Sequence, residues 1–227
     1  MMNILIMAAH PDDEVLGCGG TIARLVTEGH QVHVAILGEG ITSRYRQRDQ
    51  ADKDLILQLK GKSHQVGELL GVDQVYTFDL PDNRFDTIPL LDIIKPIEDL
   101  IECIQPQIIY THHGGDLNID HCQVFRATLT AARPLPGFPV KTIYAYEVPS
   151  STEWAFGKFH PPFQPNVFMD ITTTLENKIH AMALYETEGR NFPHPRSPEA
   201  LRATAIRWGA VSGCCAAEAF ELVREVR

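Results

Sequence analysis

The chain has 227 residues, of which 44% are hydrophobic and 22% charged, and its formal net charge at pH 7 is −9. This is the composition of an ordinary globular protein with room for one sizeable core, so we expect a single domain over residues 1–227. The negative charge and the lack of a Lys/Arg-rich run disfavour nucleic acid as a partner.

The cysteines and the N-terminal segment indicate where the protein works. Five cysteines, an odd number without a Cys-x-x-Cys pair, argue against a disulfide framework and fit a reducing compartment. The apolar opening MMNILIMAA is too short to span a bilayer and lacks a basic start, so we interpret it as a buried strand. We therefore expect a cytoplasmic protein without a membrane span; whether it forms a homo-oligomer is left open.

Short apolar runs alternate with longer amphipathic ones along the first two-thirds of the chain. They predict strands at 3–9, 31–37, 74–78, 107–111 and 141–147, and helices at about 19–28, 49–70, 90–104 and 120–133. This alternation predicts an α/β fold with a parallel, doubly wound sheet. Beyond it we expect an ordered loop over 148–165, a strand near 166–170, and helices near 173–188 and 197–211.

Ligands of such sheets bind outside the carboxyl ends of the strands, where the strand order reverses. For the common order 3-2-1-4-5, this place lies between the first and fourth strands. The residues just after Ala9 and just after Thr111 are therefore where we expect the chemistry.

Two polar segments follow these two strands. HPDDE at 10–14 is followed by GCGG at 17–20, and HHGGDLNIDH occupies 112–121. Each segment alone has a structural explanation, since acidic residues are favoured at helix starts and Asp120 with Gln123 resembles a capping box. Together they place imidazoles and carboxylates at one crevice, and a divalent cation turns clustered carboxylates into ligands.

The glycines do not indicate a dinucleotide-binding loop. Their spacing does not match G-x-G-x-x-G, and the neighbouring acids would repel a pyrophosphate. Two histidines and one carboxylate would leave coordination positions open, as in catalytic zinc sites, although the same set also suits non-haem iron. A further aspartate beside the ligands could accept a proton from water.

The string AHPDDE at 9–14 and the later Asp120-His121 resemble the two motifs of the PIG-L/LmbE-type N-deacetylase family. The resemblance implies a Rossmann-like three-layer α/β sandwich with a mostly parallel sheet. It also implies a zinc-dependent hydrolase that removes an acetyl or other acyl group from an N-acylated amino sugar or its conjugate. The expected cofactor is one Zn²⁺ per chain, with Fe²⁺ as the alternative.

The resemblance also assigns roles to residues. The metal ligands are His10, Asp13 and His121, and Asp12 is the general base, with Glu14 in support. We expect Asp120, in the second motif, to belong to the catalytic group with Asp12 and Asn118.

Asn118 is a departure from the family pattern, which often has a histidine at this position to stabilise the oxyanion and assist proton transfer. An asparagine can donate a hydrogen bond to an oxyanion but cannot supply a proton at neutral pH. The acid role is therefore left to protonated Asp12 or to another group, with His113 and His194 as candidates.

Four residues are expected to bind substrate: Arg48, His113, Glu147 and His194. Arg48 resembles an arginine that family members place at the acyl end of the pocket. Glu147 precedes a loop with Trp154, which could stack on a sugar. Each residue also has a simpler interpretation as a loop, helix-start or packing residue.

Three other functions are left open. The same scaffold could serve a metal-dependent hydratase or lyase, which acetate release would separate from a deacetylase. A sugar- or nucleotide-binding module without turnover is a second alternative, because the family's histidine is missing at Asn118. An iron oxygenase is the least favoured, since no β-barrel is predicted.

Overall fold

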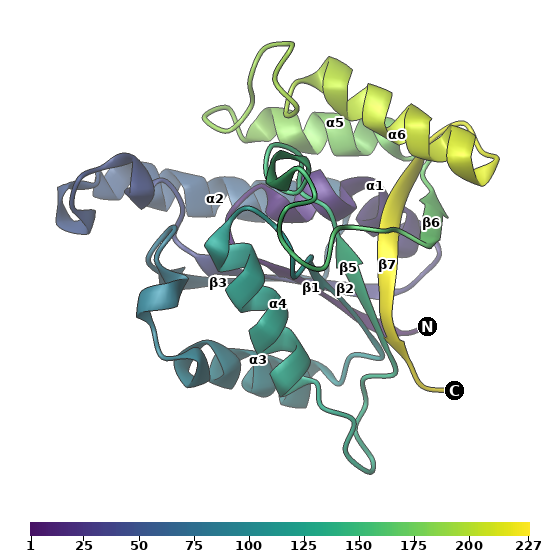
Figure 1. Cartoon of the computed structure of the whole chain (residues 1–227), viewed down its shortest axis with the longest axis horizontal. Helices are drawn as coiled ribbons and strands as arrows, with labels where there is room; N and C mark the ends of the chain where they lie inside the picture. The colour runs from purple at the N-terminus through teal and green to yellow at the C-terminus, as the bar shows by residue number, and fades with distance from the viewer.

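The computed structural model describes residues 1–227, and its centre is a seven-stranded sheet with the order β3-β2-β1-β4-β5-β7-β6. The first five strands pair in parallel, whereas β7 runs antiparallel to β5 and β6 (Figure 1). This confirms the predicted α/β fold and the order 3-2-1-4-5. The strands are β1 (Asn3–Ala8), β2 (Gln31–Gly38), β3 (Gln74–Leu80), β4 (Ile108–His112), β5 (Thr142–Tyr146), β6 (Val167–Asp170) and β7 (Ala217–Glu225).

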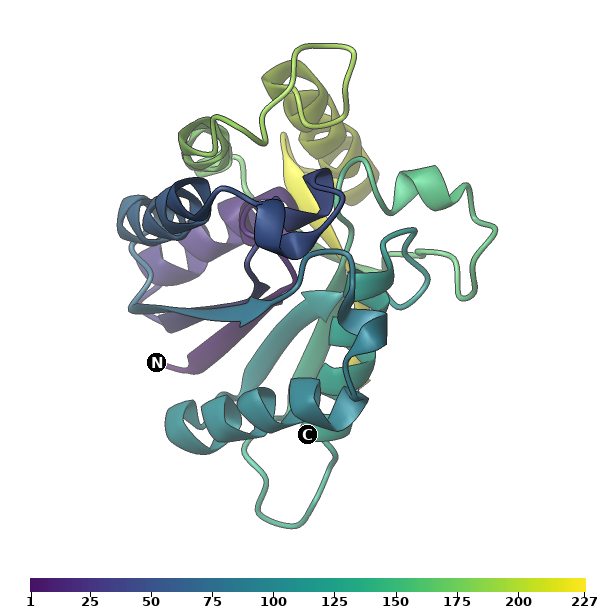
Figure 2. The same ribbon diagram turned by 90° about the vertical axis from the view of Figure 1, so that its left-hand side faces the viewer.

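Six helices cover the sheet and complete a three-layer sandwich (Figures 1 and 2). Side chains of α1, α2, α5 and α6 join the core on one face, and those of α3 and α4 join the core on the other. The helices are α1 (Asp13–Thr27), α2 (Lys53–Leu70), α3 (Leu90–Ile104), α4 (Ile119–Ala131), α5 (Leu175–Leu184) and α6 (Pro198–Ser212).

The central strand β1 is buried on both faces. Successive side chains of a strand point to opposite sides, so Ile4 and Ile6 enter the core under α1 and α2, while Leu5 and Met7 enter the core over α3 and α4. A run without polar residues is what a parallel strand between two helical layers requires. This explains why the apolar N-terminal segment is a strand.

The glycines at 17–20 lie inside α1, which begins at Asp13 and not near residue 19 as predicted. A Cβ atom at Gly17 would lie 2.2 Å from Cδ2 of the buried Tyr146 ring, and one at Gly20 would lie 2.8 Å from Cδ1 of Ile171. The glycines therefore allow α1 to approach the sheet and its neighbours closely, at some cost in helix propensity.

The start of α2 and the presence of β7 also differ from the sequence-based prediction. Helix α2 starts at Lys53 because the Asp52 side chain caps it, accepting the amide hydrogens of Asp54 and Leu55; Arg48–Gln50 form a separate short turn. Strand β7 was not predicted. It begins in the alanine-rich stretch around Ala217, and alanine has low strand propensity, so the local sequence gives little sign of a strand.

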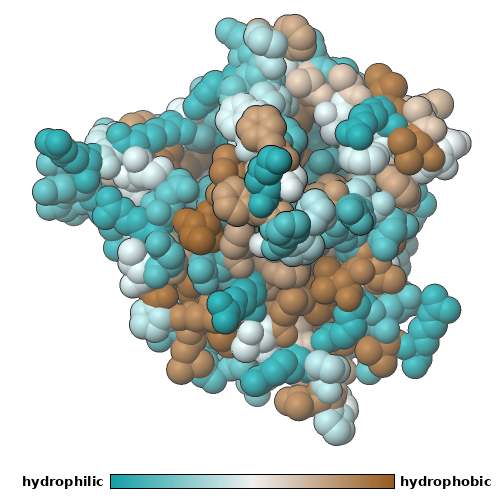
Figure 3. All heavy atoms as spheres, viewed as in Figure 1, coloured by the Kyte–Doolittle hydropathy of each residue, from teal (hydrophilic) through white to brown (hydrophobic).

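The surface mixes hydrophobic and hydrophilic side chains on the face seen in Figure 3. None of the helices is both long enough and apolar enough to cross a membrane.

Candidate functional site

The polar segments of the sequence meet at the carboxyl ends of β1 and β4, which pair side by side in the sheet. His10 and Asp13 follow β1, and His121 lies in the first turn of α4, after β4. This is the crevice that the strand order predicts for a ligand.

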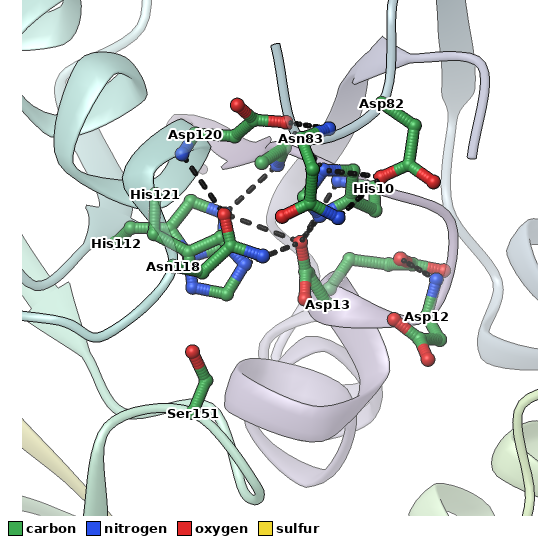
Figure 4. Close-up of polar contacts among 12 residues, drawn as sticks. His10, Asp12, Asp13, Asp82, Asn83, His112, Asn118, Asp120, His121 and Ser151 are labelled. Carbon is green, nitrogen blue, oxygen red and sulfur yellow. Dashed lines mark hydrogen bonds and ion pairs between the residues drawn. The ribbon is translucent and has the colours of Figure 1, made fainter. Parts of the chain in front are cut away.

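His10, Asp13 and His121 form a compact group whose side chains point toward one another (Figure 4). His10 Nδ1 and His121 Nε2 each lie 3.3 Å from Asp13 Oδ2, and one ligand atom from each residue falls within 4.8 Å of the others. Two imidazole nitrogens and one carboxylate oxygen are a donor set suited to zinc or iron. The three residues can hold a metal ion.

Each histidine of this group has a second carboxylate at its other ring nitrogen. His10 Nε2 lies 2.9 Å from Asp120 Oδ2, and His121 Nδ1 lies 3.3 Å from Asp116 Oδ1. Such outer carboxylates fix the orientation and tautomer of metal-binding histidines. They leave His10 Nδ1 and His121 Nε2 directed at Asp13.

These outer carboxylates are themselves held in place. Asp120 accepts the backbone amides of Asn83 at 2.6 Å and Phe85 at 2.9 Å, which ties the loop after β3 to α4. Asp116 accepts hydrogen bonds from the hydroxyls of Ser151 and Thr152. The carboxylates that orient both histidines are thus supported by the loops after β3 and β5; Figure 4 shows Asn83 beside Asp120.

The group lies in an anionic environment. Burial alone would lower the pKa of His121, but Asp13 and Asp116 outweigh it and raise this pKa to about 9. Burial would also raise the pKa of Asp13, yet the imidazoles of His121 and His112 hold it well below its usual range. The site therefore favours positive charge between these residues, as a metal ion would supply.

Asp12 stands beside the group in an unusual backbone conformation, with a φ of 106°. Residues other than glycine adopt such angles at an energetic cost, and they occur most often at functional sites. Burial raises the pKa of its carboxyl well above the usual range, which Arg196 partly offsets through a 2.6 Å contact between its Nη1 and Asp12 Oδ2. The guanidinium thus favours the ionised form of a buried carboxyl.

Asn118 is the N-cap of α4, and its Oδ1 accepts the backbone amide hydrogen of Asp120 at 2.9 Å. Asn118 Oδ1 is therefore already hydrogen-bonded to the backbone of α4. The side-chain NH₂ group donates no hydrogen bond within the chain, and Asn118 lines a polar cavity beside His10.

A cavity of about 300 Å³ opens beside His10 and Asp12. Its lining is mostly polar and includes Arg44, Asp82, Asn118, Trp154, Glu188, Arg190, His194 and Arg196. The Trp154 and His194 rings meet edge to face, with centroids 5.5 Å apart. An aromatic ring and polar side chains around a space of this size suit a monosaccharide unit.

Three residues expected to bind substrate do not line this cavity. His113 is buried, with Nδ1 2.9 Å from Glu221 and Nε2 2.8 Å from the carbonyl oxygen of Pro161. Arg48 makes two 2.8 Å bonds to Glu39 in a separate surface hollow.

Glu147, the third, accepts a hydrogen bond from the Trp208 indole and lines another small cavity. Of the four expected substrate-binding residues, the structure brings only His194 to the cavity.

Sequence reasoning gave no role to Asp116, which contacts His121, or to Arg196, which contacts Asp12. Asp116 lies in the second polar segment but outside the motif that the resemblance covers. Arg196 follows His194 in the segment FPHPR, and its contact with Asp12 joins residues 184 positions apart. The only sequence signal for either was its place in a short polar segment near a candidate residue.

Comparisons with known proteins identify the family of the chain. The family model PIG-L, GlcNAc-PI de-N-acetylase, matches residues 5–132. An uncharacterised deacetylase YaiS of Escherichia coli is 30% identical, over 74% of this chain and 82% of its own length. The diacetylchitobiose deacetylase of Thermococcus kodakarensis is 25% identical, over 97% of this chain and 83% of its own.

A solved structure shares the fold across the whole chain. The 4-carboxy-2-hydroxymuconate hydratase of Pseudomonas putida superposes with a TM-score of 0.77 and 20% identity, covering 100% of this chain and 98% of that one. The family match includes the strands β1 and β4 and both segments that supply His10, Asp13 and His121. The chain belongs to the PIG-L family of deacetylases.

Proposed function

We propose that this chain is a zinc-dependent hydrolase that removes an acyl group, most simply acetyl, from an N-acylated amino sugar or its conjugate. The observation that carries the proposal is the juxtaposition of Asp12 with the group His10, Asp13 and His121 at a polar cavity. The family membership and the sugar-directed deacetylases among the relatives support the substrate class.

His10, Asp13 and His121 would hold the ion, and a set of three protein ligands is typical of catalytic zinc sites. Zinc bound there would polarise an acyl oxygen and lower the pKa of water. The outer carboxylates Asp116 and Asp120 would keep the imidazoles in place throughout the reaction.

Asp12 is the proposed base. Its carboxylate would accept a proton from the attacking water, and Arg196 at 2.6 Å favours the ionised form that this requires. The side-chain NH₂ of Asn118 would donate a hydrogen bond to the oxygen of the acyl group as negative charge develops on it, while Asn118 Oδ1 remains bound to α4.

Asp12 is also the proposed acid that protonates the leaving amine. His113 has both ring nitrogens engaged, so it is not free to deliver a proton. His194 lines the cavity, but burial and the neighbouring Arg196 and Arg190 lower its pKa, which favours the neutral ring at pH 7. We therefore assign His194 to substrate contact, beside Trp154.

The test is a screen of N-acetyl amino sugars and their conjugates for release of both free amine and acetate, with metal analysis of the same sample. We expect stoichiometric release of amine and acetate that stops when a chelator removes the metal and returns when zinc is added. Turnover that persists after the metal is fully removed would contradict the proposal.

A hydratase on the same scaffold is the second candidate, because a hydratase shares the fold at a TM-score of 0.77. A hydratase adds water to a double bond and releases no acetate. The screen therefore separates the two, provided that an unsaturated carboxylic acid is included and its loss of absorbance is followed.

A further inference from the structure

The segment at residues 188–196 borders two cavities. One is the polar cavity beside Asp12. The other has a volume of about 450 Å³ and lies between α5 and the start of α6, with Ile179, Met182 and Leu201 in its lining. Arg190 and Arg196 line both cavities. Both arginines therefore lie beside the space into which a group attached to a sugar in the first cavity could extend.

The arginines differ in what they already bind. Arg196 Nη1 contacts Asp12 at 2.6 Å, and its Nε bonds to Ser150 Oγ at 2.8 Å. Arg44, a third arginine on the wall of the first cavity, is bonded to both carboxylate oxygens of Glu188 at 2.7 Å. Asp12 and Glu188 are therefore already paired with Arg196 and Arg44.

Arg190 alone has no acidic partner. Its polar contacts are the carbonyl oxygens of Thr187 at 2.7 Å and Gly189 at 2.9 Å, both made by Nη1. Arg190 is exposed, and its other donors remain free. A planar guanidinium with free donors suits two-point binding of a carboxylate or phosphate.

We propose that Arg190 binds an anionic group, a carboxylate or a phosphate, attached to the acylated sugar, and so selects anionic conjugates over neutral sugars. The proposal rests on the proposed function and adds the charge of the substrate. The net charge of −9 repels anions in general, so an anionic substrate would need a local cation such as Arg190 at its site.

The test compares pairs of substrates in which one member is anionic and the other is neutral. One pair is a glycoside of N-acetylglucosamine with a carboxylate in its aglycone and the methyl ester of the same compound. The other pair is N-acetylglucosamine 1-phosphate and the methyl glycoside. We measure kcat/KM for the wild type, Arg190→Ala, Arg190→Lys and the control Arg126→Ala, an exposed arginine that lines neither cavity.

The wild type and the control should prefer the anion by roughly threefold to tenfold, with the preference falling at high salt, as expected for a partly exposed charge. Arg190→Ala should remove the preference by lowering kcat/KM for the anion more than for the neutral substrate, and Arg190→Lys should retain part of it. The pair that shows the preference identifies the anion as carboxylate or phosphate.

Equal loss of turnover on charged and neutral substrates in Arg190→Ala would overturn the proposal, since Arg190 would then only support its loop. A wild type without preference in either pair would do the same. Calorimetric binding of the same compounds separates this proposal from the proposed function. Arg190-dependent binding of an anion without any hydrolysis would refute only the hydrolase, whereas hydrolysis with charge-independent binding would refute only the role of Arg190.

Discussion

Replacing Gly17 by alanine tests whether close packing of α1 on the sheet explains the glycine-rich segment. The added Cβ would lie 2.2, 2.7 and 2.8 Å from three atoms of the Tyr146 ring, so the ring or the helix must move by more than 1 Å to reach the 3.4 Å of an ordinary contact. The ring is held, because the Tyr146 hydroxyl donates to the Met7 carbonyl oxygen at 2.7 Å. Overpacking of this kind costs about 3 kcal/mol, and the gain in helix propensity returns about 1 kcal/mol.

We therefore expect Gly17→Ala to lower the free energy of unfolding by about 2 kcal/mol, or Tm by about 4–8 °C, in urea and thermal unfolding. The matched control is Gly61→Ala in α2, where a Cβ meets nothing within 4 Å. The control should gain about 0.5–1 kcal/mol. If both variants gain stability equally, the glycines do not serve close packing and the account of α1 is wrong.

Three further predictions concern the site and its support. Asn118→Ala should lower kcat by about 10²–10³-fold, and it should lower the free energy of unfolding by about 1 kcal/mol because the helix cap is lost. Asn118→Asp should also lose activity but keep the helix cap. Equal stability of the two variants would contradict the capping role. Asp116→Asn should weaken metal affinity by about 10–100-fold in a competition titration, and unchanged affinity would refute its orienting role toward His121. Lys178→Met should cost about 3–5 kcal/mol in urea unfolding, because it leaves buried Glu218 without its 2.6 Å partner. A loss below 1 kcal/mol would contradict a stabilising role for this buried pair.

The position of the site could be predicted because it depends on strand order alone. Alternating strands and helices predict a parallel sheet, and the order 3-2-1-4-5 places the residues after β1 and β4 at one crevice. His10, Asp13 and His121 meet there in the structure. Local sequence patterns were sufficient to place these three residues, because each lies directly after a strand or in the first turn of a helix.

The positions of the other polar side chains depended on hydrogen-bond partners that no local sequence pattern reveals. His113 is held by Glu221 of the unpredicted strand β7, and Glu147 by Trp208 of α6. Arg196 reaches Asp12 across most of the chain. A long polar side chain takes the partner that the tertiary structure offers, so its destination cannot be predicted until the neighbouring elements are placed.

The most direct test of the central claim is to measure metal content and turnover together in Asp12→Asn. The amide keeps the shape of the side chain but cannot accept a proton, and His10, Asp13 and His121 are unchanged. We predict one bound divalent ion per chain and a turnover lower by about 10²–10⁴-fold. An Asp12→Asn protein that loses the metal, or that keeps the metal with normal turnover, would contradict the separation of base and ligands on which the account rests.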